Sequence, residues 1–323
     1  MRTEEKYISL LTDFGFKRIF GQEVNKDLLI DFLNSLFEGE QVITDLQYLN
    51  GENLPDSAIE RKAIFDIYCM NERGERFIVE MQNATESFMK DRTIYYSTFP
   101  IREQAERGEE WNYKLSPIYV VAIVNFDMRE PSFNPQTIKH SISLRDDDTL
   151  RQFSNKVNFK YVEVSKFNKT EDQLETLSDK WLFALKNMSR LDSVPSSLSS
   201  QVFQKLFEQA RIAAFTPAEF NEYEGSLKVY RDLHNSINCA KEEGKAEGLA
   251  QGKAEGLAEG MEKGLAQGRA EGEAKGRAEG EAKGIAQANI TNAKNFLACG
   301  VAPETVAQCT GLPLDEVLKL LPK

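Results

Sequence analysis

Residues 63–83 read AIFDIYCMNERGERFIVEMQN, two runs of strand-forming residues joined by a short polar segment. Side chains along a strand alternate between its two faces. The face opposite Asp66 and Glu80 is wholly apolar and predicts contact with a hydrophobic core. Its members are Ala63, Phe65, Ile67 and Cys69 in the first run and Phe77, Val79 and Met81 in the second.

The loop of this hairpin predicts a register that opposes two acids. Residues 72–74 read ERG and fit a three-residue loop, with Gly74 at the position that needs a positive φ. Counting back along both strands then sets Asp66 opposite Glu80. Opposed residues have Cβ atoms about 5 Å apart, and like charges there repel. A divalent cation bound by both carboxylates would compensate this repulsion. The alternative is a pair of solvated carboxylates on a half-buried strand.

Further motifs follow in order along the chain: TDFGFKRIFG at 12–21, DFLN at 31–34, FD at 65–66, VEMQ at 79–82, then Arg92, Tyr95, Tyr96, Gln104, Gly108 and LSP at 115–117. No single motif is specific, but the ordered set resembles the PD-(D/E)XK nuclease superfamily. Within it, the set is similar to the recombination-promoting nuclease (Rpn) and transposase family. Two departures are Ile64-Phe65 in place of a Pro-like position before Asp66, and Gln82 in place of Lys.

The resemblance implies a metal-dependent DNA endonuclease. In such an enzyme Asp66, Glu80 and the backbone carbonyl of Met81 bind Mg²⁺, for which Mn²⁺ can substitute. A Gln side chain is not a base, so Gln82 would orient a water molecule or bind a phosphate oxygen. The resemblance also implies roles in recombination, transposition-like mobility or phage defence.

Three further residues are candidates for the lining of this site. By resemblance, Asp13 is a candidate third carboxylate near the metal, and Gln104 faces the site. Lys17 is a candidate phosphate contact. The alternatives are a plain helix N-cap for Asp13 and a solvated side chain for Lys17.

Charge and composition limit the possible functions. The net charge is −11, and residues 1–240 carry 29 basic and 38 acidic side chains. DNA binders usually present a basic surface, so a DNA-binding surface here must be local. The acidic charge and Gln82 favour an alternative, a non-catalytic interaction or assembly protein that retains the nuclease fold.

The expected location is the cytoplasm. The four cysteines are scattered, without a CxxC motif, and are typical of reduced thiols. The N-terminal residues 1–11 contain no apolar signal segment, and the longest apolar run, 118–124, is too short to span a membrane. We therefore expect no membrane association.

Residues 1–240 predict an α/β domain with a mixed sheet flanked by helices, the core of restriction-endonuclease-like proteins. Helices are expected at 13–20, 25–37 and 87–107, and further helices between 170 and 240. Strands are expected at 42–49, 116–126 and 158–164 besides the hairpin, with 116–126 central because it is apolar throughout. Residues 127–150 are expected to be irregular.

The rest of the chain predicts two helical parts. In residues 241–288, Gly recurs at every fourth position from Gly244 to Gly284, among Ala, Glu, Lys and Arg. This pattern predicts a marginal, solvated helix that acts as a spacer. Residues 289–323 predict a small all-α module similar to a helix-turn-helix, but with only three basic and three acidic residues. We expect a homo-oligomer formed through the spacer or this module.

Overall fold

The computed structural model describes residues 5–49, 65–85, 88–105 and 112–321. Within those residues, six strands form one mixed sheet in the order β1-β2-β3-β4-β6-β5. Strands β3, β4 and β6 are parallel, and the outer pairs are antiparallel. The predicted mixed sheet with a central 116–126 strand is confirmed. The strands are β1 (Leu46–Tyr48), β2 (Ile67–Asn71), β3 (Arg76–Gln82), β4 (Ile118–Val124), β5 (Lys139–Arg145) and β6 (Gln152–Glu163).

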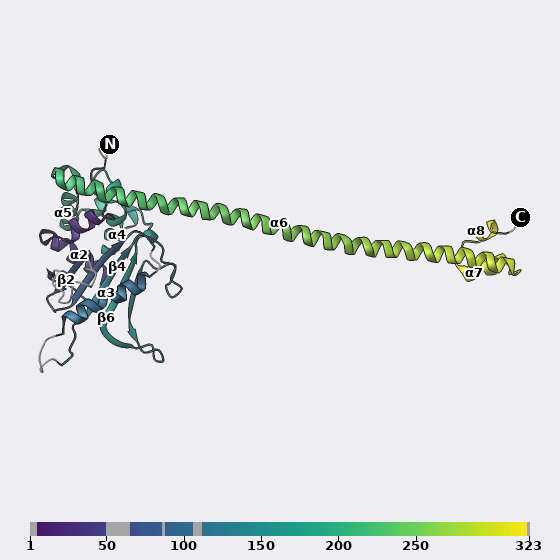
Figure 1. The fold of residues 1–323 in the computed structure, drawn as a ribbon, viewed down its shortest axis with the longest axis horizontal. Coiled ribbons are helices and arrows are strands. Elements are labelled where there is room, and N and C mark those ends of the chain that lie inside the picture. Colours follow the sequence, from purple (N-terminus) through teal and green to yellow (C-terminus); the bar gives the residue numbers. More distant parts are fainter. Residues whose placement is uncertain (1–4, 50–64, 86–87, 106–111, 322–323) are drawn as a thin grey trace, which may run out of the picture. The chain divides into compact units, whose positions relative to one another are not determined.

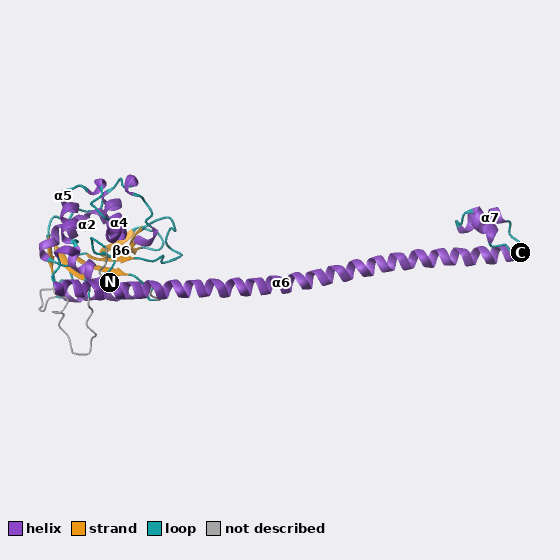
Figure 2. Cartoon of the chain, turned by 90° about the horizontal axis from the view of Figure 1, so that it is seen from above, coloured by secondary structure: helices purple, strands orange, loops and turns teal. Residues whose placement is uncertain are grey.

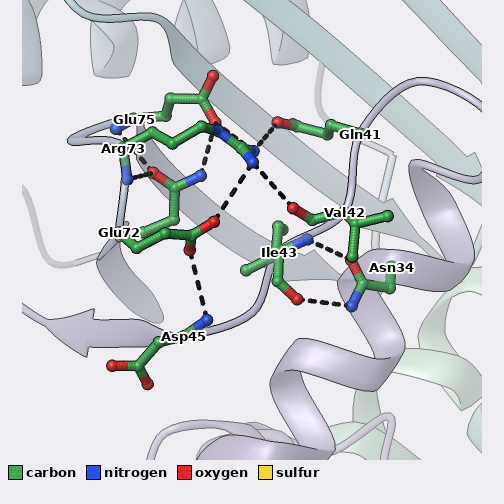
Figure 3. Close-up of polar contacts among 9 residues, drawn as sticks. Asn34, Gln41, Val42, Ile43, Asp45, Glu72, Arg73 and Glu75 are labelled. Carbon is green, nitrogen blue, oxygen red and sulfur yellow. Dashed lines mark hydrogen bonds and ion pairs between the residues drawn. The ribbon is translucent and has the colours of Figure 1, made fainter.

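The β2–β3 hairpin has the predicted register. Asn71 N–H donates to the carbonyl of Glu75 (3.0 Å), and Gly74 has a φ of +76° at the last loop position. The guanidinium of Arg73 fastens this turn to the segment before β1, because it donates to the carbonyl of Val42 and to the carboxylate of Glu75 (Figure 3). The register is therefore fixed at the turn, which also fixes the pairing at the open end of the hairpin.

Helices cover both faces of the sheet. One face packs against the larger hydrophobic core, to which the predicted apolar residues Ile67, Val79 and Met81 belong. On this side lie α2, α4 and α5 (Figure 2), and α1 contributes to the same core. The helices of this layer are α1 (Asp13–Phe20), α2 (Lys26–Leu36), α4 (Leu177–Asn187) and α5 (Gln201–Gln209). The other face packs against α3 (Met89–Glu103), seen across the strands in Figure 1.

Two predictions about the sheet are wrong. Phe65 belongs to the smaller core with Tyr68 and Phe99, because β2 begins only at Ile67 and the strand alternation does not reach back to Phe65. Residues 127–150 contain the strand β5, in which Ile142 and Leu144 alternate with serines, but this pattern is short and most of the strand's side chains are exposed. Ala63 and Ile64 lie outside the described residues.

The chain divides into two compact units, Met1–Cys239 and Ala240–Lys323. Helix α6 (Pro217–Ala298) is 82 residues long and runs through the glycine repeat. Every side chain in residues 241–288 is exposed, and a methyl group added at any repeat glycine would meet nothing within 4 Å. The predicted solvated helix is therefore present.

The second unit ends in two short helices, α7 (Pro303–Thr310) and α8 (Leu314–Lys319). They pack with the end of α6 around Ala293, Val306 and Val317. No helix in the described part of the chain has the length and apolar character needed to cross a membrane.

Candidate active site

Asp66 and Glu80 lie opposite each other at the open end of the β2–β3 hairpin. Ile67 pairs with Val79, and one step back along both segments sets Asp66 against Glu80. Asp66 N–H donates to Glu80 Oε1 (3.2 Å), and Met81 N–H donates to Asp66 Oδ2 (2.9 Å). Each carboxylate thus accepts a hydrogen bond from the backbone of the opposite segment, which holds both acids at the same point of the sheet.

Burial determines the charge of this pair. Glu80 is only 2% exposed, and burial followed by the negative charge of Asp66 raises the pKa of Glu80 to about 8. Burial also raises the pKa of Asp66, although the Met81 N–H and the charge of Lys17 oppose the shift. The two acids are coupled, so in the absence of a bound cation the pair retains a proton near neutral pH, mainly on Glu80.

Two cationic side chains approach the pair from different helices. Lys17 Nζ, from α1, lies 3.4 Å from Asp66 Oδ1. Arg92 Nη2, from α3, lies 3.7 Å from Glu80 Oε2. Arg92 also donates through Nε to Tyr96 Oη (3.0 Å) and lies over the Tyr96 ring. Both helical layers therefore contribute positive charge beside the carboxylates.

Asp13 lies beside Lys17, one turn earlier in α1. The N-cap of α1 is Thr12, whose Oγ1 accepts from Gly15 N–H (3.1 Å). The Asp13 side chain is 67% exposed, with Oδ1 2.6 Å from Lys17 Nζ. Burial lowers the pKa of Lys17, but the hydrogen bond to Asp13 and the charge of Asp66 outweigh it and raise the pKa above its ordinary value. The ammonium of Lys17 therefore stands between two carboxylates.

Met81 and Gln82 complete the end of β3. The N–H and C=O of one strand residue point to the same edge, so the Met81 carbonyl faces the same edge as its N–H, toward Asp66. Gln82 lies two residues after Glu80 and shares its face of β3, with a half-buried side chain. The amide of Gln82 can donate and accept hydrogen bonds but carries no charge.

A polar network beside this strand end was not predicted. Asn125, directly after β4, donates through Nδ2 to Asn83 Oδ1 (3.3 Å) and Tyr230 Oη (3.4 Å), with His234 Nε2 at 3.5 Å. Asn83 Nδ2 donates in turn to the carbonyl of Leu11 (2.6 Å). The network joins the segment before α1, two central strands and α6. Asparagines directly after two neighbouring strands were the available signal.

The prediction that Gln104 faces the site is wrong. Gln104 Oε1 accepts from Ser116 N–H (2.7 Å), and its Nε2 donates to the Ser116 carbonyl (3.4 Å). Ser116 precedes the start of β4, whereas Glu80 pairs with Ala122 further along that strand. Arg92 of α3 lies beside Glu80, whereas Gln104, just after the end of α3, lies away from the carboxylates and holds the segment that leads into β4.

A family model described as PD-(D/E)XK nuclease family transposase matches residues 10–240. The chain belongs to this family. The matched range contains Asp66, Glu80 and both neighbouring cations, and it confirms the family resemblance on which the prediction rested. Searches of curated proteins and of solved structures gave no match.

Membership of a PD-(D/E)XK nuclease family supports a nuclease or transposase type of function, and nucleases of this superfamily generally use divalent metal ions. Among the described residues, no group of three or more His, Cys, Asp and Glu side chains is arranged to bind a metal. The groups here that could bind a divalent ion are therefore two carboxylates, of Asp66 and Glu80, and the backbone carbonyl of Met81. These are hard oxygen ligands, and Mg²⁺ commonly keeps several waters besides one or two carboxylates.

Proposed function

We propose that the chain is a DNA endonuclease that hydrolyses phosphodiester bonds with Mg²⁺, or with Mn²⁺ in its place. The observation that carries this proposal is the cross-bonded pair of the buried Glu80 and the partly buried Asp66 in a chain of a PD-(D/E)XK nuclease family. Lys17 and Arg92 do not fully offset the burial and mutual repulsion of these carboxylates, because the pKa of Glu80 is still raised to about 8. A divalent ion bound to both would supply further positive charge.

In this proposal Asp66, Glu80 and the carbonyl of Met81 hold the ion. When bound, the ion would polarise the phosphodiester and lower the pKa of a coordinated water. Gln82 cannot remove a proton, so its amide orients the attacking water or donates to a phosphate oxygen. Arg92 stabilises the ionised form of Glu80.

The DNA must be held by local positive charge, because the whole chain has a net charge of −11. Lys17 and Arg92 provide such charge directly beside the carboxylates. A cation bound to Asp66 and Glu80 would further reduce the negative potential that phosphates meet there. DNA is therefore the proposed substrate despite the acidic composition.

We propose three functional parts: the nuclease domain at 1–240, the spacer at 241–288 and the helical module at 289–323. The spacer sets a distance, and the spacer or the terminal module assembles copies of the chain. Cytoplasmic location also remains our proposal.

A plasmid-nicking assay with the full chain tests the nuclease. We expect nicking with Mg²⁺ or Mn²⁺, none with EDTA, and loss of about 10³-fold or more in Asp66→Asn and Glu80→Gln, because each removes a ligand charge. Glu208→Gln is the matched control, since Glu208 is an exposed carboxylate on α5. Wild-type rates in Asp66→Asn, or nicking that persists in EDTA, would refute the proposal.

A further inference from the structure

The catalytic strand β3 brings no positive charge to the proposed site. Glu80 and Gln82 share one face at the end of β3, and Gln82 carries a neutral amide. An ammonium or guanidinium that binds the substrate phosphate must therefore come from another element. Lys17 on α1 and Arg92 on α3 are the cations in contact with the carboxylates among the described residues.

Lys17 lies at the border between the carboxylates and an open groove. Its side chain is 39% exposed, and its Nζ reaches Asp66. The groove has a volume of about 520 Å³ and runs between α1 and the first turns of α6. It is lined by two cations and two acids as well as uncharged residues: Lys17, Arg18, Asp13, Glu222, Phe14, Gln22, Gly225 and Ser226. A phosphate in this groove can approach Lys17 without displacing packed side chains.

Arg92 is less suited to this role. Its guanidinium is hydrogen-bonded to Tyr96 and lies over the Tyr96 ring. Lys17, in contrast, is a compact point charge on a flexible stem, and lysine is a common ligand of phosphate groups. The partner of Lys17 on the outer side is the exposed Asp13.

The helix that carries Lys17 is held firmly in place. A Cβ at Gly15 would lie 2.1 Å from the carbonyl oxygen of Ser9, so α1 packs directly on the preceding backbone. Phe14 N–H donates to Ser226 Oγ (3.1 Å), and Ser9 N–H donates to Tyr223 Oη (3.0 Å), which tie this region to α6. The location of Lys17 is thus set by a rigid element and by its ion pair with Asp13.

We propose that Lys17 binds the phosphodiester that is cleaved beside Asp66 and Glu80, and that Asp13 positions Lys17 and binds no metal. The assignment rests on the proposed nuclease function. Asp13 keeps the ammonium near the site when a divalent ion compensates the charge of Asp66 and weakens its attraction for Lys17. The ligand class is the phosphate backbone of DNA.

The test compares Lys17→Met with the control Lys228→Met, which removes an exposed lysine from α6. We expect Lys17→Met to remain folded and still to bind Mg²⁺ by calorimetry, with an affinity altered by the loss of a charge beside Asp66, but to nick plasmid about 10²-fold more slowly. Adding Gln82→Lys should restore most of the rate, because it returns an ammonium to the face of Glu80. A wild-type rate in Lys17→Met, or no gain from Gln82→Lys, would overturn the assignment.

Asp13→Asn separates positioning from metal binding. A positioning role predicts slower nicking with unchanged Mg²⁺ affinity, and rescue of the rate by the same Gln82→Lys substitution. A loss of Mg²⁺ affinity of about tenfold or more would show instead that Asp13 is a metal ligand and would overturn this part.

An error in the proposed nuclease function and an error in the role of Lys17 would give different experimental results. If wild-type chain cleaves no DNA with any divalent ion, the proposed function is wrong, and binding of a fluorescent DNA duplex in Ca²⁺ decides the role of Lys17. A phosphate contact predicts that Lys17→Met lowers the salt dependence of log K by about 1, whereas Lys228→Met leaves it unchanged. Equal slopes for all three proteins would overturn the assignment.

Discussion

The backbone N–H of Asp66 lies 3.2 Å from Oε1 of Glu80, so one member of the acidic pair donates a hydrogen bond to the other. A donor of this kind favours the charged carboxylate, yet the pKa of Glu80 is raised to about 8 because burial and the charge of Asp66 outweigh it. The proton on Glu80 neutralises one negative charge of the pair, as a bound metal ion would. Its consequences can be measured in the metal-free protein.

Glu80→Gln should alter the pH dependence of metal-free stability. The pKa of Glu80 is about 8 in the folded chain and 4.5 ordinarily, so between these values the folded state holds a proton that the unfolded state has released. The free energy of unfolding therefore falls as pH rises through this window. Glu80→Gln cannot ionise at this position, so its free energy of unfolding does not fall in this way. The difference in unfolding free energy between Glu80→Gln and wild type should therefore increase by about a few kcal/mol from pH 5 to pH 8.

Urea denaturation in EDTA across this pH range measures the difference. Glu208→Gln is the control and should follow the wild-type curve, because Glu208 is exposed. Parallel curves for Glu80→Gln and wild type would show that Glu80 ionises normally in the folded chain.

Binding of Mg²⁺ should release about one proton near neutral pH, because a carboxylate must be ionised to coordinate the metal. The raised pKa of Glu80 identifies the proton. Calorimetry in two buffers with different ionisation enthalpies counts the protons released, and the affinity should increase from about pH 6 to pH 8. Binding that is independent of pH would place the metal away from Glu80.

Two substitutions at Asp66 separate its charge from its hydrogen bond. Both Asp66→Asn and Asp66→Ala remove the charge that repels Glu80, so both should lower the pKa of Glu80 and abolish cleavage. Only Asp66→Asn keeps an acceptor for Met81 N–H. We therefore expect metal-free Asp66→Asn to be about 1 kcal/mol more stable than Asp66→Ala by urea denaturation. Equal stabilities would mean that the Met81 N–H donates a hydrogen bond to water in Asp66→Ala.

The opposition of Asp66 and Glu80 could be predicted because it depends on local rules. A three-residue loop with Gly74 at the positive-φ position fixes the register, and the period of two then carries it along both strands. The ordered motifs supplied the family. Gly311, at positive φ directly after α7, shows the same kind of local signal at a helix end.

Features that depend on packing between distant segments could not be predicted. The ion pair between Lys17 and Asp66 joins residues 49 positions apart and depends on how α1 packs beside the hairpin. Gln104 was misplaced because the pattern does not say how far α3 extends past the site. The Asn83–Asn125 contact joins residues 42 positions apart, and no local periodicity encodes such a pair.

Two glycines in helices should respond oppositely to alanine. A Cβ at Gly15 would approach Ser9 O to 2.1 Å and Thr12 Oγ1 to 2.8 Å, so Gly15→Ala must displace α1. We expect a loss of roughly 2 kcal/mol or more in unfolding free energy, with slower cleavage because Lys17 moves. At Gly260 a Cβ meets nothing within 4 Å, so Gly260→Ala should increase helix stability by up to about 1 kcal/mol.

Circular dichroism and urea denaturation of the two variants test this contrast. Gly260→Ala should also leave plasmid nicking unchanged, because Gly260 lies in the second compact unit. A Gly15→Ala protein with wild-type stability and rate would show that α1 can shift without consequence for the site.

Deletions in the glycine repeat test whether the spacer supplies only distance. Removing one tetrad, residues 257–260, shortens the helix by about 6 Å and rotates the C-terminal remainder of the helix by about 40° around its axis. Every side chain of the repeat is exposed, so no packing inside this chain opposes the change. We therefore expect nicking rate and oligomeric state to decline only gradually over deletions of one, two and three tetrads.

A deletion of 18 residues, 249–266, separates distance from helical phase, because about 18 residues make five whole turns and leave the phase unchanged. If distance matters, this deletion should reduce assembly more than the loss of one tetrad does. If the repeat is instead a coiled-coil interface between copies, the one-tetrad deletion should reduce assembly more than the 18-residue deletion does. A change of helical phase moves the side chains out of the positions in which they pack against the facing helix. Sedimentation velocity and nicking assays on both deletions would decide between them. Loss of assembly with one tetrad but not with 18 residues would refute the spacer and identify a specific interface.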